Sequence, residues 1–150
     1  MYILKAYMIV KMQTAFINSP LGITKIVGDE NGITEISVTS EGVISEIIPT
    51  ELQEAATQLS DYFDGKRKDF NFKLNPKGTD FQQKVWQELL QIPFGKTISY
   101  LDLSKKLGDV KAIRAVASAN GKNPLWIVVP CHRVIGTDGS LTGYAGGLWR

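Results

Sequence analysis

The chain has one cysteine and one histidine, and they are neighbours, Cys131 and His132. A lone cysteine cannot form an internal disulfide, and one Cys with one His cannot supply the four ligands of a structural zinc site. Carboxylates are present, but no Asp-rich loop has the spacing of a calcium site. A fold of these 150 residues must therefore rest on its hydrophobic core, for which 43% apolar residues suffice. We expect no metal site.

The apolar runs are far shorter than a membrane span, and the N-terminus lacks the pattern of a cleaved signal peptide. Because disulfides are also impossible, we expect a soluble protein of a reducing compartment, the cytoplasm, with no membrane contact.

Charge is distributed unevenly along the chain. Residues 1–74 hold seven Lys and Arg against ten Asp and Glu, whereas residues 75–150 hold ten against five. The net charge of +2 therefore combines a half of −3 with a half of +5. A basic half is typical of a nucleic-acid surface, although a solvated basic face is the more common explanation.

Short β-prone runs fill the first half. Strands are predicted at 14–17, 23–27 and 33–38, and the connection 28–32 ends in Asn-Gly, which indicates a hairpin. A further strand is predicted at 43–48.

A helix is then predicted to begin at Pro49-Thr50 and to end before Gly65. Its apolar face consists of Leu52, Ala55, Ala56, Leu59, Tyr62 and Phe63. Residues 70–78, which include Pro76 and Gly78, have the composition of a linker.

The second half predicts three helices. Thr79 caps the first, whose apolar residues are Phe81, Val85, Trp86, Leu89 and Leu90. Ser99 caps a short helix over 100–107, and a turn with Gly108 leads to a third helix over 111–121. Two short helices joined in this way are typical of a helix-turn-helix, but many helical hairpins have the same spacing.

The third helix carries one long cation, Arg114, among Ala115, Ala117 and Ser118. Small side chains allow close approach either to a neighbouring helix or to a sugar-phosphate backbone. Because several polar base readers are missing, a DNA-binding role would be largely indifferent to sequence.

An apolar run at 125–129 predicts a buried strand, which ends at Pro130-Cys131-His132. Cys131 is either core filler or a nucleophile at the start of a loop. Neighbouring side chains on an extended backbone point apart, so His132 can assist Cys131 only if the chain turns sharply. A Cys hydrolase is disfavoured, because there is no second histidine to act as its base.

The run Pro130-Cys131-His132-Arg133-Val134-Ile135-Gly136 resembles the active-site motif of the O6-alkylguanine-DNA alkyltransferases, also called methylated-DNA–protein-cysteine methyltransferases. Residues 79–86, 92–100, 114–124 and 143–148 resemble further motifs of this family, in the same order. Residues 12–68 resemble its variable N-terminal domain more loosely.

The resemblance implies an α+β fold. Residues 1–75 would form a small β-sheet/helix domain of ribonuclease H-like type, with residues 1–11 as an extension if Met12 is the start. Residues 76–150 would form a mainly helical DNA-binding and alkyl-acceptor domain, with a helix-turn-helix and the cysteine loop. Family members continue into a last helix with a glutamate that completes a Cys–His–water–Glu relay, and we expect that helix to be missing here.

The implied reaction is direct DNA repair, by irreversible and stoichiometric transfer of the alkyl group from a flipped-out O6-alkylguanine to Cys131. It needs no cofactor, and the partner is double-stranded DNA bound by a monomer. By resemblance, His132 acts as a base through a water, Asn123 braces the active site, Tyr100 contacts base and phosphate, and Arg114 enters the base stack. The implied DNA contacts also include Ala115, Ala117 and Ser118, and the implied base pocket includes Val134, Tyr144, Ala145 and Gly146.

Two other functions remain open from the sequence. One is a non-catalytic lesion sensor of the alkyltransferase-like class, although such relatives replace the cysteine. The other is a helix-turn-helix regulator that senses alkylation, although such sensors carry extra N-terminal cysteines.

Overall fold

The computed structural model describes residues 11–136. Its first part is an antiparallel sheet of β1 (Gln13–Ser19), β2 (Gly22–Asp29) and β3 (Gly32–Thr39), in that order across the sheet. The predicted strands and hairpin are confirmed, but the hairpin turn is shorter than expected because β2 runs on to Asp29. Gly32 follows this turn with φ of 130°, a conformation that favours glycine.

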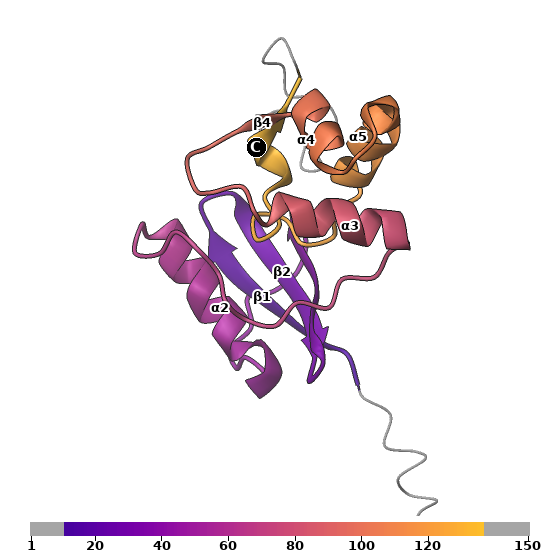
Figure 1. The fold of residues 1–150 in the computed structure, drawn as a ribbon. Coiled ribbons are helices and arrows are strands. Elements are labelled where there is room, and N and C mark those ends of the chain that lie inside the picture. The colour runs from indigo at the N-terminus through magenta and orange to yellow at the C-terminus, as the bar shows by residue number, and fades with distance from the viewer. Residues whose placement is uncertain (1–10, 137–150) are drawn as a thin grey trace, which may run out of the picture.

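One helix, α2 (Thr50–Phe63), covers one face of this sheet (Figure 1). It buries the apolar side predicted from the sequence, with Leu52, Ala55 and Leu59 at most 1% exposed. These side chains belong to one continuous core together with strand residues such as Ala15, Ile26 and Ile36.

The predicted strand at 43–48 is wrong. Residues 41–49 form no strand, and Val43 and Ile47 are 83% and 86% exposed. The segment is held to β1 by Ser45, whose backbone N–H donates to the Phe16 carbonyl (3.0 Å) and whose hydroxyl accepts from the Phe16 N–H (2.9 Å). Because a side chain takes the Phe16 donor, a regular ladder cannot form there.

The free edge of β3 is covered by two later segments. Leu74 bridges to Ile33 and Leu125 bridges to Ile36, both in parallel orientation. The predicted linker is thus only partly a linker, because the Ile33 N–H donates to the Lys73 carbonyl (2.9 Å) and Phe72 is buried.

The three predicted helices are present as α3 (Asp80–Leu89), α4 (Tyr100–Lys106) and α5 (Ile113–Gly121), the last preceded by the 3-10 turn η1 (Val110–Ala112). Thr79 forms a capping box with Gln82, and Ser99 accepts from the Asp102 N–H. The buried side of α3 is narrower than predicted, since Phe81 and Leu90 are 37% and 43% exposed.

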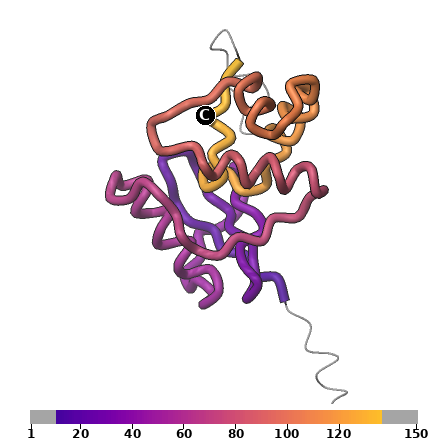
Figure 2. Tube along the Cα trace, in the orientation of Figure 1, coloured from indigo at the N-terminus to yellow at the C-terminus, as the bar shows by residue number. Residues whose placement is uncertain are grey.

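The predicted strand at 125–129 is also wrong. Only Leu125 pairs with a strand, and residues 126–128 form a turn in which the Val129 N–H donates to the Leu125 carbonyl (3.0 Å). Periodicity cannot distinguish a buried apolar turn from a strand. This segment, orange-yellow in Figure 2, lies between the sheet and the helices α4 and α5.

The fold is α+β, as expected, with a three-stranded sheet and one helix followed by a mainly helical half that carries Cys131. None of the helices between residues 11 and 136 has the length and apolar character needed to cross a bilayer.

Candidate active site

Cys131 begins a 3-10 turn, η2 (Cys131–Arg133), directly after Pro130. The turn is closed by the Arg133 N–H, which donates to the Pro130 carbonyl (2.9 Å). It leads into β5 (Val134–Ile135), which pairs in parallel with β4 (Ile98–Ser99) just before α4. The sharp turn that His132 needs in order to assist Cys131 is therefore present. The thiol is buried, with Cys131 only 2% exposed.

Asn123 holds the chain that leads to this turn. Its Nδ2 donates to the carbonyls of Val129 (2.7 Å) and Leu125 (3.3 Å), and its Oδ1 accepts from the Leu125 N–H (2.9 Å). Between them Ile127 has φ of 74°, which costs a β-branched residue on the order of 1–3 kcal/mol. A buried amide that satisfies three backbone groups stabilises a turn that the backbone alone would not hold.

Tyr100, at the first position of α4, is linked to Cys131 by Asn120, a residue that the sequence did not single out. Asn120, on α5 and 0% exposed, donates from Nδ2 to the Tyr100 hydroxyl (3.1 Å) and to the Cys131 carbonyl (3.4 Å). Asn120 precedes a glycine near the end of a predicted helix, where an asparagine attracts no notice. Only the packing of α4 beside α5 identifies it.

The titrating groups of the site are shifted toward their neutral forms. Burial, with a smaller contribution from the Arg133 charge, lowers the pKa of His132 from 6.5 to about 4. Burial also raises the pKa of Tyr100; the Asn120 hydrogen bond opposes this and the nearby Cys131 adds to it. At neutral pH His132 is therefore a neutral imidazole, and the same shift makes it a weaker proton acceptor than an exposed histidine, while Tyr100 keeps its hydroxyl hydrogen.

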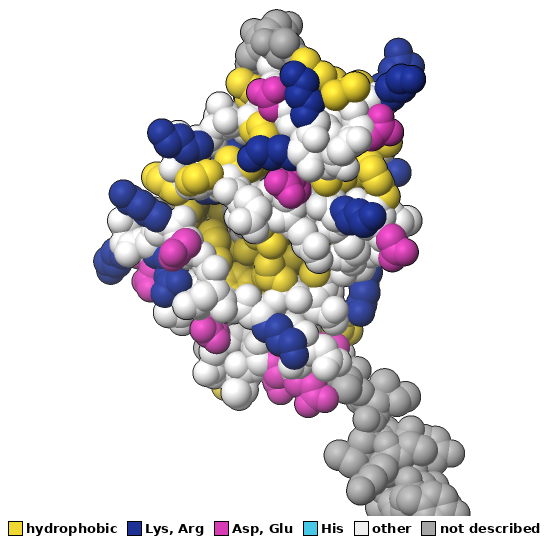
Figure 3. Space-filling view, in the orientation of Figure 1, with side chains coloured by type: hydrophobic (Ala, Val, Ile, Leu, Met, Phe, Trp, Pro, Cys, Tyr) yellow, Lys and Arg dark blue, Asp and Glu magenta, His cyan; other side chains and the backbone are white. Residues whose placement is uncertain are grey.

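Arg133 is a second residue that the sequence did not single out. Its Nη1 donates to the Ile92 carbonyl (2.7 Å), and its guanidinium carbon lies 5.7 Å from the centre of the Phe94 ring. Ile92 and Phe94 line a hollow of about 200 Å³, whose lining also includes Phe70 and Phe72. Figure 3 shows this hollow with its hydrophobic floor between α2 and α3. Arg133 thus ties the cysteine turn to the segment that follows α3.

The outer side of α5 has the character predicted from its composition. Arg114, Ala115 and Ser118 are exposed and Ala117 is partly exposed, while the opposite side is buried. None of the three ion pairs found among residues 11–136 uses Arg114. The helix therefore presents one cation on a surface of small side chains.

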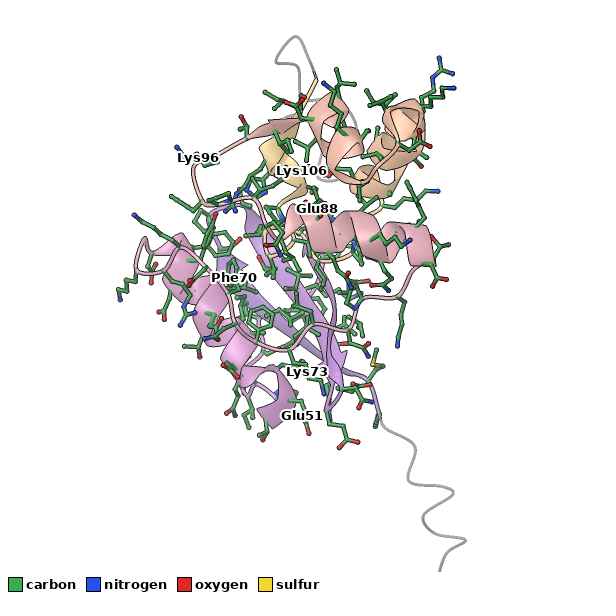
Figure 4. The ribbon with its side chains drawn as sticks, in the orientation of Figure 1. Glu51, Phe70, Lys73, Glu88, Lys96 and Lys106 are labelled. Carbon is green, nitrogen blue, oxygen red and sulfur yellow. The ribbon has the colours of Figure 1, made fainter. Side chains whose placement is uncertain are left out.

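Two surface hollows at opposite ends of the molecule differ in the charge of most of their lining residues. Lys96, Lys105 and Lys106 line a groove beside α4, and the first and last of them appear at that end in Figure 4. At the other end, where Figure 4 labels Glu51, a hollow is lined by Asp29, Glu30, Glu51, Glu54 and Lys73. The groove lined by lysines is the one beside α4.

The structure thus brings Tyr100, Asn123, Cys131, His132 and Val134 into one region and places Arg114 on the outer side of the adjacent helix α5. The predicted pocket residues Tyr144, Ala145 and Gly146 lie outside the described residues.

Known proteins resemble this chain over most of its length. Residues 80–150 match the family model for the DNA binding domain of 6-O-methylguanine DNA methyltransferase, and residues 12–76 match the model for its ribonuclease-like domain. The methylated-DNA–protein-cysteine methyltransferase of Methanosarcina barkeri is 45% identical over 139 residues, which span 88% of this chain and 87% of that protein. This chain belongs to the 6-O-methylguanine DNA methyltransferase family. The resemblance noted in the sequence is confirmed.

Solved methyltransferase structures show the same architecture. The crystal structure of Mycobacterium tuberculosis O6-methylguanine methyltransferase has a TM-score of 0.82 and 40% identity, covering 93% of this chain and 88% of that one. A structure of the protein from the same organism in complex with DNA has a TM-score of 0.80 and 42% identity, covering 89% of this chain and 84% of that one.

Proposed function

We propose that this methyltransferase-family chain repairs O6-alkylguanine in DNA directly, by moving the alkyl group to the sulfur of Cys131. The observation that carries the proposal is the position of the chain's lone cysteine. Its thiol is buried, it begins a tight turn, and Asn120 links its backbone carbonyl to the Tyr100 hydroxyl by hydrogen bonds. Core filler would not need an amide, Asn123, that braces the chain directly before its turn, or a neutral histidine, His132, within that turn.

The reaction is one displacement. The sulfur of Cys131 forms a bond to the alkyl carbon while the bond from that carbon to guanine O6 breaks. The thiol gives up its proton, and the guanine leaves with the electron pair and takes up a proton, so that unmodified guanine and a thioether result. The thioether has no hydrolytic exit, so each molecule acts once.

His132 would accept the thiol proton through a water molecule. Its pKa of about 4 keeps the imidazole neutral at physiological pH, which leaves one ring nitrogen free to accept. A thiolate is the reactive form of cysteine, so this step controls the nucleophile.

DNA would approach the outer side of α5. The small residues Ala115, Ala117 and Ser118 allow a close fit in the minor groove, and Arg114 would occupy the place of the flipped base. The lysines beside α4 would add attraction to phosphates that depends on salt and not on sequence. On this proposal residues 76–150 bind the DNA, and the protein acts as a monomer in the cytoplasm.

Val134 and the segment with Tyr144, Ala145 and Gly146 would complete the pocket for the base. Tyr100, which keeps its hydrogen, would contact the base and the adjacent phosphate as a donor.

The test is incubation with a duplex that contains O6-methylguanine, followed by the mass of the intact chain and of the Cys131 peptide. We expect the mass of one methyl group on Cys131 and none in Cys131→Ser. Tight binding of the damaged duplex with no change in mass would favour a lesion sensor. Methylation at another residue would contradict the assignment of Cys131.

A further inference from the structure

Asn120 is a buried amide whose hydrogen-bonding capacity the fold satisfies only in part. Its side chain makes two hydrogen bonds through Nδ2, to Tyr100 and to Cys131, but its Oδ1 has no hydrogen-bond partner among the residues that the structure describes. A buried carbonyl oxygen without a partner destabilises a protein. An apolar residue of similar size would leave no such atom but would lose both bonds, so what the asparagine supplies on this side of α5 is its contacts to Tyr100 and Cys131.

The direction of the two hydrogen bonds follows from chemistry. The Cys131 carbonyl can only accept, so the amide must turn its NH₂ group toward it. The same NH₂ group faces the Tyr100 hydroxyl, whose oxygen therefore accepts. The hydrogen of that hydroxyl is then directed away from Asn120.

We infer that Asn120 is a positioning residue for alkyl transfer: it fixes the Tyr100 hydroxyl as a donor toward the flipped base and holds the carbonyl of the nucleophile's own residue in place. This inference rests on the proposed function. A hydroxyl on a freely rotating C–O bond can donate or accept, and a fixed donor selects a base that offers an acceptor atom at that point. The burial that raises the pKa of Tyr100 keeps the hydroxyl protonated.

The test is a double-mutant cycle on the rate of methyl transfer from a saturating duplex, measured in a single turnover. The variants are Asn120→Leu, Tyr100→Phe and the two combined. We expect each single change to slow transfer by about tenfold or more. If Asn120 acts through Tyr100, the double variant is slower than the slower single variant by no more than about twofold.

Asn120→Asp gives an independent answer if Asn120→Leu does not fold. A carboxylate has the same shape but can only accept, so it would draw the Tyr100 hydrogen toward itself. We expect a rate at or below that of Tyr100→Phe. Gln58→Leu is the matched control, because it also removes a buried amide. Gln58 lies in α2, away from the cysteine turn, and its amide bonds to Glu54 in the same helix and to Asn71 beyond it. It should transfer at the wild-type rate.

The outcomes separate the two ideas. If wild-type protein leaves Cys131 unmodified, the proposed function fails and this inference fails with it. If wild-type protein is active but the two losses multiply, or Asn120→Leu or Asn120→Asp keeps the wild-type rate, only the positioning role of Asn120 is overturned.

Discussion

The indole Nε1 of Trp86 donates a buried hydrogen bond of 2.9 Å to the backbone carbonyl of Ala119. Trp86 belongs to α3 and Ala119 to α5, so this bond fixes the helix that carries Arg114 against the helix beneath it. Ala119 is buried, and its carbonyl also accepts from the Lys122 N–H (3.2 Å), which is shared with the Ser118 carbonyl (3.1 Å), so without the indole only this shared bond would remain.

Replacing Trp86 by Phe should therefore lower the free energy of unfolding by about 2–3 kcal/mol, from the lost bond and lost volume. Urea unfolding measures this. Phe81→Leu in the same helix is the control, because Phe81 is 37% exposed and should change stability by less than about 1 kcal/mol. Equal losses in both variants would contradict the role of the indole.

Asn123→Ala should damage both the fold and the reaction. It leaves the Leu125 N–H and the Val129 carbonyl without their buried partner, which costs about 2–4 kcal/mol in unfolding free energy. Because the turn after them carries Cys131, methyl transfer should slow by about 10²-fold or more below the melting temperature. Asn18→Ala, at an exposed position in β1, should change neither quantity, and a normal rate in Asn123→Ala would show that the turn holds without its amide.

The pH dependence of stability should carry the signature of His132. Its pKa is about 4 in the folded chain and 6.5 ordinarily, so between these values the unfolded chain binds a proton that the folded chain does not. The contribution of His132 to the free energy of unfolding is complete above pH 6.5. It falls by about 2–3 kcal/mol as the pH drops toward 4.

His132 is the chain's lone histidine, so His132→Gln is a clean comparison. Urea unfolding from pH 5 to 7 should give a flatter curve for the variant. Parallel curves for the two proteins would mean that the imidazole titrates normally in the folded state.

Arg114→Ala should slow repair of O6-methylguanine in a duplex by about tenfold or more, with little effect on reaction with free O6-benzylguanine. The reason is that the arginine would replace the flipped base in the stack, a task that a free base does not require. Lys66→Ala, which removes one exposed cation beyond the end of α2, is the control and should leave both rates unchanged. Equal losses on the two substrates would contradict the intercalating role.

Local signals predicted much of this fold. The capping residues Thr79 and Ser99 marked helix starts to the residue, because a cap depends only on neighbours along the chain. The sequence could not reveal that the run at 125–129 is a turn, since its hydrogen bonds come from the Asn123 side chain and the edge of β3. Asn120 was missed for a related reason: its partners come from other elements, which only the packing brings within reach.

The bridge between Ile36 and Leu125 bears on how this protein can be divided. The Ile36 N–H donates to the Pro124 carbonyl (2.8 Å) and the Trp126 N–H donates back to the Ile36 carbonyl (3.0 Å), one residue beyond the amide that braces the cysteine turn. A fragment without the sheet would lose these two hydrogen bonds and would expose the apolar side chains that pack against the sheet. The sheet thus supports the segment that leads to the reactive turn. Removing the sheet would slow the reaction although none of the reacting atoms belongs to it.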